Sequence, residues 1–232
     1  MISVVIPTSN AAPSLPATLA ALQSGRESGL IGEVLITDGG SEDETIAIAE
    51  AAGAKVLRGA QGHGGHGSRG GQLQRGAVAA VGDWFLFLHG DTVLADNWLF
   101  AVEAFIADQN NNARAAAFRF ALDDPDPKAR RLEKIVAWRC AKFGLPYGDQ
   151  GLLMSRQFYG KVGGYRDLPL MEDVDLVRRI GRKRLAMLPI AATTSARRYR
   201  EGGYGLRPAR NLLCLSLYFL RVPPKYLVKL YK

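Results

Sequence analysis

Short apolar runs alternate with helix-like segments through the first 110 residues of the chain. Four runs have the length and the β-branched or aromatic content of buried strands, at residues 2–8, 33–37, 55–58 and 84–88. Helical patterns stand between and after them, at 13–24, from about 43, at 71–81 and from about 97. This alternation is typical of βαβ units. We therefore predict an α/β fold with a mostly parallel central sheet that is flanked by helices.

Two of these runs end in an acidic corner. The second leads into Asp38, and the fourth leads into His89-Gly90-Asp91. The carboxyl ends of parallel strands form the edge at which open α/β sheets bind ligands, so we expect both carboxylates there. A carboxylate on such a turn can hold a divalent metal that carries a diphosphate. The alternative for Asp91 is a cap for the helix near Asn97, or a turn residue.

The second half of the chain contains further predicted elements. These are strands at 115–121 and 151–155, helices at 128–143 and from 172 to about 182, and a loop at 144–150. Glu172, Asp173 and Asp175 begin the last helix, where capping and the helix dipole ordinarily explain acidic residues. Tyr165, which follows two glycines, suits either stacking on a sugar ring or the core.

The motifs, in this order, resemble the family 2 glycosyltransferases of the Rossmann-like GT-A fold, in the nucleotide-diphospho-sugar transferase superfamily. The resembling segments are Val4-Val5-Ile6-Pro7-Thr8-x-Asn10, Val34-Leu35-Ile36-Thr37-Asp38-Gly39-Gly40-Ser41-x-Asp43-x-Thr45, Gly82 to Thr92, and Gly163-Gly164-Tyr165 followed by Met171 to Leu176. The resemblance implies a GT-A domain at 1–205, with a nucleotide-binding half at 1–110 and an acceptor half with a smaller sheet region at 111–205. A basic, apolar C-terminal helix and tail would follow at 206–232.

The resemblance also implies a role for each motif. Asp173 matches the general base, and Glu172 matches its neighbour facing the acceptor. Asp38 matches the aspartate that accepts a hydrogen bond from the nucleobase, and Asp91 matches the carboxylate that holds Mn²⁺ or Mg²⁺. The residues expected around the nucleotide are Pro7, Thr8, Asn10, Asp38, Arg69, Arg75, His89, Gly90 and Arg198.

The implied activity is metal-assisted, inverting transfer of a hexosyl group from a UDP- or GDP-sugar to an acceptor hydroxyl. One carboxylate base suffices for a single in-line displacement, whereas retention needs a second carboxylate as nucleophile. Two features depart from the family pattern. His89 replaces the first carboxylate of the family's Asp-x-Asp motif, and no later histidine is available as a metal ligand. The Gln-x-x-Arg-Trp motif of processive synthases is also absent, so we expect a non-processive enzyme.

Two other functions remain open. A sugar-phosphate nucleotidyltransferase shares the nucleotide-binding sheet but normally has a glycine-rich loop with a lysine after the first strand, and residues 8–16 contain neither. A non-catalytic nucleotide-sugar binding protein fits the replacement at His89. The glycine-rich segment 59–76 is expected to form a flexible loop beside phosphates, and its His63 and His66 lack the further ligands of a zinc site.

The net charge of +8 indicates an acidic partner. A nucleic acid is not expected because the chain has no nucleic-acid-binding motif, whereas a nucleotide diphosphate fits. We expect a cytoplasmic protein, since Cys140 and Cys214 suit buried free thiols and the sequence shows neither a signal segment nor a membrane span. Residues 206–232 are apolar with basic flanks, which suits either a core helix or peripheral contact with the inner membrane face beside a lipid-linked acceptor.

Overall fold

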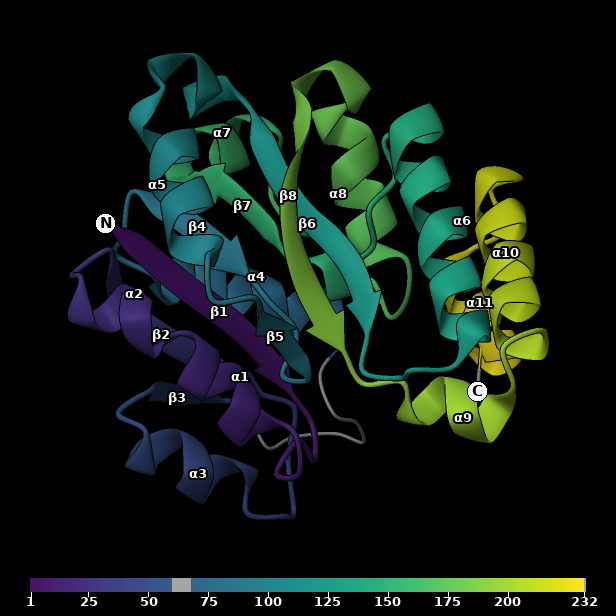
Figure 1. Ribbon diagram of the computed structural model, residues 1–232, viewed down its shortest axis with the longest axis horizontal. Coiled ribbons are helices and arrows are strands. Elements are labelled where there is room, and N and C mark those ends of the chain that lie inside the picture. The colour runs from purple at the N-terminus through teal and green to yellow at the C-terminus, as the bar shows by residue number, and fades with distance from the viewer. Residues whose placement is uncertain (60–67, 232) are drawn as a thin grey trace.

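The computed structural model describes residues 1–59 and 68–231 and folds them around one eight-stranded sheet (Figure 1). His63 and His66 lie outside the described residues. The strands are hydrogen-bonded in the order β3-β2-β1-β4-β7-β6-β8-β5. Their bounds are β1 Ile2–Thr8, β2 Ile31–Asp38, β3 Lys55–Arg58, β4 Trp84–Phe87, β5 Thr92–Leu94, β6 Ala115–Leu122, β7 Leu152–Ser155 and β8 Leu185–Thr194.

Strands β3, β2, β1 and β4 are all parallel, as the alternating pattern predicts. Thr8 pairs with Asp38 in the register of β1 and β2, and Val5 pairs with Phe87 in that of β1 and β4. The carboxyl ends of these three strands therefore meet at one edge of the sheet.

The sheet becomes mixed beyond β4. Strand β7 runs antiparallel to β4 and β6, β8 runs parallel to β6, and β5 runs antiparallel to β8. Phe87 at the end of β4 pairs with Leu152 at the start of β7. The loop before β7 consequently lies at the same edge as the end of β4. The expected smaller sheet region continues the central sheet.

Helices cover both faces of this sheet. Two buried clusters show the division, because β1 sends Val4 and Ile6 into one cluster and Val5 into the other. The first cluster includes residues of α1, α3 and α5, and the second includes residues of α4, α7 and α8. The bounds are α1 Leu15–Ala21, α2 Gln23–Glu27, α3 Thr45–Ala51, α4 Arg69–Ala79, α5 Trp98–Ala107, α7 Arg156–Lys161 and α8 Glu172–Ile180, with 3-10 segments η1 Gln109–Ala113, η2 Gly148–Gln150 and η3 Arg182–Arg184.

The remaining helices stand beside the β6 and β8 end of the sheet (Figure 1). They are α6 (Pro127–Phe143), α9 (Arg197–Gly202), α10 (Leu206–Phe219) and α11 (Pro224–Tyr231). Helices α10 and α11 bury Cys214, Leu215 and Leu227 against Met171 and Val174, at the start of α8. The predicted C-terminal tail is therefore a second helix with an anchored side chain. Within the described residues, no helix combines the length and the apolar character that crossing a membrane requires.

Several local predictions can be compared with the structure. The helix expected at 13–24 is divided at Leu22 into α1 and α2, and the helix expected to reach 182 ends at Ile180 because Gly181 adopts a φ of +80°. Cys140 and Cys214 are buried and free, as predicted. Tyr165 is buried and packs edge-on against Phe87, so it belongs to the core.

Candidate active site

Two cavities lie at the edge where β1 and β4 end. The first has a volume of about 500 Å³ and is lined by the loops after β1 and β4 and by α9. The second, of about 460 Å³, is lined mainly by α6, α9, α10 and the loop before β7. Five residues line both cavities: Arg69, His89, Asp91, Ser195 and Arg198. This shared wall is where groups bound in the two cavities would meet.

The first cavity is built on two loops that hold each other. The Asn10 N–H donates to Ser41 Oγ at 2.9 Å, and Asn10 Oδ1 accepts from the Glu42 N–H at 2.9 Å. Asp43 Oδ2 accepts from the Ala12 N–H at 3.0 Å. The loop after β4 is joined to them by Ser14, whose Oγ donates to the Gly90 carbonyl at 2.9 Å. Seven of the nine predicted nucleotide-binding residues line this cavity, namely Pro7, Thr8, Asn10, Arg69, His89, Gly90 and Arg198.

Asp38 anchors one of these loops. Its side chain is buried and accepts hydrogen bonds from Thr8 Oγ1, from Ser41 Oγ and from the backbone N–H groups of Gly40 and Ser41. Burial alone would raise the pKa of Asp38, but these bonds outweigh it and lower the pKa. Asp38 is not among the residues that line the first cavity, so the contact with a nucleobase stays a prediction. The Arg75 guanidinium also contacts Asp38: its Nη2 donates a hydrogen bond to the Asp38 backbone carbonyl at 3.4 Å.

Asp91 and His89 lie next to each other on the shared wall. The Asp91 side chain is 32% exposed, and its Oδ1 lies 4.0 Å from His89 Nδ1. Helix α5 has Asn97 as its N-cap, so Asp91 is not the cap of that helix. Burial, together with the charges of Arg69 and Arg198, lowers the pKa of His89 well below its usual range. The imidazole is therefore neutral at physiological pH.

Arg69, at the start of α4, joins the shared wall to the acidic start of α8. It forms an ion pair with Glu172, and its Nη2 lies 3.6 Å from Asp173 Oδ2. Burial disfavours the guanidinium charge, but Glu172 and Asp173 outweigh that effect and raise the pKa of Arg69. Burial raises the pKa of Glu172, and Arg69 opposes the shift. Glu172 is 1% exposed and lines neither large cavity, so it holds Arg69 instead of facing an acceptor.

Asp173 faces the second cavity. Its Oδ2 accepts a hydrogen bond from the Gly148 N–H at 2.8 Å. A Cβ at position 148 would lie 2.5 Å from His89 Nε2 and 3.5 Å from Asp173 Oδ2. A larger residue at position 148 would therefore displace the His89 ring. Asp175, two positions later, is ion-paired with Arg166 and Arg179 and acts as a structural residue.

Asp149 is a carboxylate that the sequence patterns do not single out. It lies in η2 and lines the second cavity, and its Oδ1 is buried with no hydrogen-bond partner among the described residues. Burial raises the pKa of Asp149 to about 6; the Arg139 guanidinium opposes the shift, and the Asp173 carboxylate adds to it. One sequence feature points to Asp149: it is an acidic residue in a turn bounded by glycines, Gly148 to Gly151, directly before a strand.

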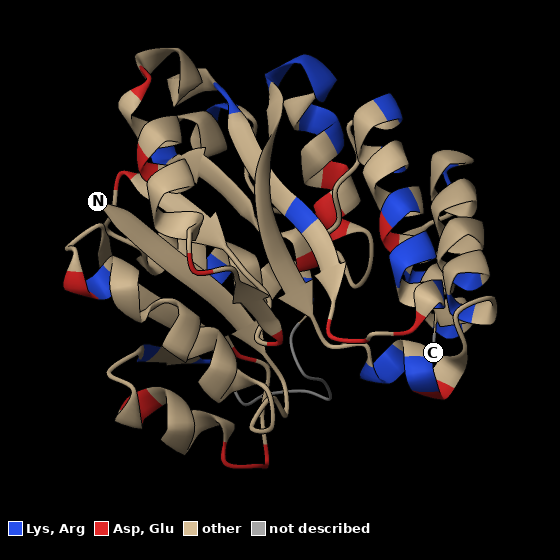
Figure 2. Ribbon diagram, viewed as in Figure 1, with Lys and Arg blue, Asp and Glu red and all other residues tan. Residues whose placement is uncertain are grey.

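The basic helix α9 borders both cavities. Arg197 lies 3.8 Å from Glu201, and Arg200 lies 3.6 Å from Asp124. Arg198, which is one of the residues expected around the nucleotide, lines both cavities and makes no ion pair within residues 1–59 and 68–231. Figure 2 shows further Lys and Arg over α6, α8 and α10, in the half of the molecule that carries the second cavity. The shared wall therefore combines the Arg198 guanidinium, which has no ion-pair partner among the described residues, with the carboxylate of Asp91.

A divalent metal would find few protein ligands at this wall. Within the described part of the chain, no group of three or more His, Cys, Asp or Glu side chains is placed to hold a metal ion. Asp91 supplies one accessible carboxylate, and neutral His89 stands beside it. Mg²⁺ characteristically binds through one or two carboxylates, water and substrate phosphates, so this small donor set fits a metal that arrives with a diphosphate.

Comparisons with known proteins identify the family and the fold of the chain. The family model described as "Glycosyl transferase family 2" matches residues 3–163. Similar solved structures include mannosyl-3-phosphoglycerate synthase from Rubrobacter xylanophilus, with 17% identity, a TM-score of 0.66, and coverage of 96% of this chain and 75% of that chain. Glucosyl-3-phosphoglycerate synthase from Mycobacterium tuberculosis, solved with Mn²⁺, UDP-glucose and phosphoglyceric acid, has 19% identity, a TM-score of 0.61, and coverage of 92% and 78%. No curated protein sequence matches the chain. The fold is GT-A, as the motifs predict.

Proposed function

Because the chain belongs to glycosyl transferase family 2, we propose that it moves a glycosyl group from a nucleoside-diphosphate sugar in the first cavity to an acceptor hydroxyl in the second. The observation that carries this proposal is the wall shared by the two cavities, with Arg69, His89, Asp91 and Arg198 on it. A donor in the first cavity would present its anomeric carbon at this wall, where Asp173 faces it from the second cavity.

The nucleotide would lie along the loops after β1 and β2. Thr8 and Asn10 line that part of the first cavity, and the predicted base contact of Asp38 would require one of its present hydrogen bonds to be exchanged. A UDP-sugar is our first choice of donor and a GDP-sugar the second. The glucosyl-3-phosphoglycerate synthase that shares the fold is solved with UDP-glucose, which supports this order.

Asp91, with His89 beside it, would hold Mn²⁺ or Mg²⁺ against the diphosphate. The metal, when bound, supplies positive charge that stabilises the leaving diphosphate. Arg198 would add a second positive charge there, because it lines both cavities and has no ion pair with the described residues. Fixed cations at the point where negative charge develops stabilise a transition state strongly.

Asp173 would accept the proton of the acceptor hydroxyl as its oxygen attacks the anomeric carbon. The bond from that carbon to the diphosphate oxygen breaks on the opposite side, so one displacement inverts the configuration. The Gly148 N–H at 2.8 Å directs Asp173 Oδ2, and Arg69 Nη2 lies 3.6 Å from the same oxygen. Glu172 acts through Arg69 and is a positioning residue.

We further propose a cytoplasmic enzyme, which is consistent with the buried free thiols of Cys140 and Cys214. A lipid-linked acceptor and peripheral membrane contact remain proposals. The exposed lysines of α11 support them, whereas the burial of Leu227 supports the alternative of a packed C-terminal helix.

The proposal is tested by calorimetric titration of UDP-, GDP- and dTDP-sugars with and without Mn²⁺. NMR of the reaction product then gives the anomeric configuration of the sugar that has been transferred or hydrolysed. We expect one nucleotide to bind more tightly with Mn²⁺ and the transferred or hydrolysed sugar to have the inverted anomeric configuration. Tight donor binding without any turnover, with a range of alcohols as acceptors, would identify a binding protein instead. Retained configuration would exclude the single displacement.

A further inference from the structure

The second cavity changes in character from its inner to its outer end. Leu132, Val136 and Leu215 are buried along its floor. Its outer part is lined by side chains that are apolar and largely exposed: Ile135 (61%), Trp138 (59%), Phe143 (52%) and Leu212 (62%). These seven residues, from α6 and α10, define the apolar groove. The groove continues the cavity that Asp173 lines.

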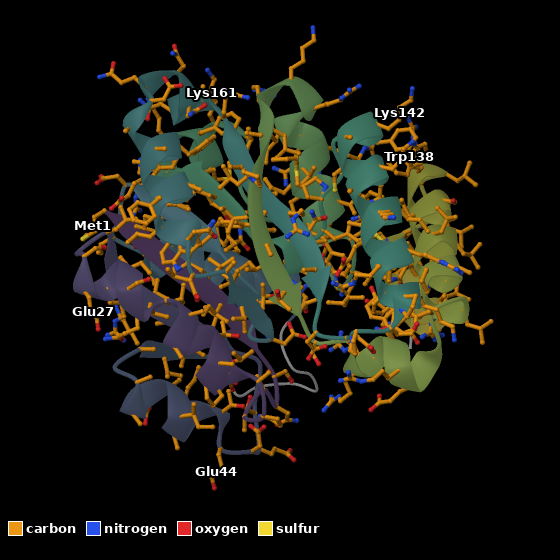
Figure 3. All side chains as sticks on the ribbon, in the orientation of Figure 1. Met1, Glu27, Glu44, Trp138, Lys142 and Lys161 are labelled. Carbon is orange, nitrogen blue, oxygen red and sulfur yellow. The ribbon has the colours of Figure 1, made fainter. Side chains whose placement is uncertain are left out.

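The groove is open to solvent along the gap between two helices. Helices α6 and α10 stand next to each other, and both line the cavity (Figure 1). Trp138 and Lys142 project from the same end of α6 (Figure 3). The Trp138 ring packs edge-on against Phe143 at a centroid distance of 5.4 Å, which keeps both rings on the groove wall. Contiguous exposed apolar surface of this kind marks a binding site more often than an ordinary solvent face.

The same cavity is also lined by two residues with buried polar atoms. Asp149 Oδ1 and Asn211 Oδ1 are both buried, and neither has a hydrogen-bond partner among the described residues. A buried polar atom without a partner costs about 1–3 kcal/mol, so such atoms usually meet water or a ligand. A ligand of this cavity therefore needs polar groups to meet these buried oxygens and apolar groups to cover the exposed rim.

We propose that the acceptor is an amphiphilic alcohol, with its hydroxyl at Asp173, its polar part beside Asp149 and Asn211, and its apolar body in the groove between α6 and α10. This inference rests on the proposed function. The volume of about 460 Å³ lies within the range of about 300–1,000 Å³ that small-molecule sites occupy. A protein partner laid over the outer rim would leave both buried oxygens unpartnered.

Tryptophan fluorescence provides a direct test. Trp84 and Trp98 are 6% and 0% exposed, so Trp138 alone among the three is open to solvent. We would titrate the full chain, in the presence of UDP and Mn²⁺, with methyl, hexyl and octyl β-glucosides below their micelle concentrations. The sugar head is constant and only the apolar tail changes. We expect saturable blue shifts with the longer tails, and a Kd that falls about fourfold per buried methylene, or about 15-fold from hexyl to octyl.

Matched variants distinguish binding in the groove from non-specific hydrophobic binding to the protein surface. Ile135→Ser and Leu212→Ser alter exposed rim positions and should weaken octyl glucoside binding at least fivefold while UDP binding is unchanged. Phe100→Ser, at a 73% exposed position on α5 that does not line the cavity, should change neither. Trp138→Phe should abolish the fluorescence shift.

The outcomes distinguish this inference from the proposed function. If UDP binds but tail length has no effect on Kd, the apolar acceptor is wrong and the transferase proposal stands. If Phe100→Ser weakens octyl glucoside as much as Ile135→Ser does, binding is non-specific and the groove assignment is overturned. Absence of binding by both UDP and GDP would instead refute the donor site.

Discussion

Replacing Asp149 by asparagine should stabilise the protein at alkaline pH relative to acidic pH. Asp149 is a carboxyl group whose pKa rises from 3.8 to about 6 on folding because it is buried. The folded state therefore holds a proton that the unfolded state has lost between about pH 4 and pH 6. In that window the free energy of unfolding falls as the pH rises, and above it the full penalty is present. Below pH 4 both states are protonated and no penalty remains.

The magnitude follows from the two pKa values. One pKa unit corresponds to about 1.4 kcal/mol, so the full penalty is about 3 kcal/mol, of which about 2 to 3 kcal/mol develops between pH 4 and pH 8. Asparagine has the same shape but no charge to desolvate. Its amide introduces a cost or gain of its own, and that part does not depend on pH. The informative quantity is therefore the difference between the effect at pH 8 and the effect at pH 4.

Urea unfolding of wild type and Asp149→Asn at pH 4, 6 and 8 measures this quantity. We expect the variant's relative free energy of unfolding to increase by about 2 to 3 kcal/mol from pH 4 to pH 8, or about 5 to 10 °C in Tm for a chain of this length. Asp96→Asn, at an exposed position, is the control and should show no such change. A constant effect of Asp149→Asn at all three pH values would refute a buried, proton-binding carboxyl group.

Four predictions concern the proposed chemistry. Asp173→Asn should leave donor affinity nearly normal in calorimetry and lower sugar transfer by about 10²-fold or more; full activity would remove it as the base. Asp91→Asn should abolish the Mn²⁺-dependent tightening of UDP binding, and a preserved metal effect would place the metal elsewhere. Arg198→Ala should weaken UDP binding more than uridine binding, whereas an equal loss would argue against a phosphate contact. Full-length protein should co-sediment with anionic vesicles at low salt, and Lys225→Gln with Lys229→Gln should weaken this without unseating α11; no co-sedimentation would favour an acceptor in solution.

The sequence patterns predicted the elements that carry Asp91 and Asp173 because each residue stands at the boundary of a regular element. Asp91 follows an apolar run that is too short for a helix, and Asp173 begins a helix with clear apolar spacing. The ion pair of Arg69 with Glu172 could not be predicted from the residues themselves, since 103 positions separate the two. That contact depends on how α4 and α8 lie together on the same face of the sheet.

Other parts of the site depend on tertiary structure in the same way. Asp149 lies in a short 3-10 segment, where no periodicity indicates which side chains face a cavity. Its place near Asp173 follows from the antiparallel direction of β7, which apolar spacing does not reveal. Tyr165 was equally suited to a sugar or to the core, and only its packing against Phe87 decides for the core. Leu227 shows the same limit in the tail, because its burial needs α8 and α10.

The pairing of β4 with β7 positions one part of the site independently of the helices that line the groove. Since Phe87 pairs with Leu152, the segments that carry Asp91 and Asp149 leave from the same residue pair of one ladder, whose strands are about 5 Å apart. Strand pairing thus brings the segments of Asp91 and Asp149 together, and neither α6 nor α10 contributes to that pairing. Changes in α6 and α10 would therefore leave the spacing of these two segments unaltered. Under the proposed function, substitutions in α6 and α10 would therefore change the choice of acceptor without moving the loops that hold the donor.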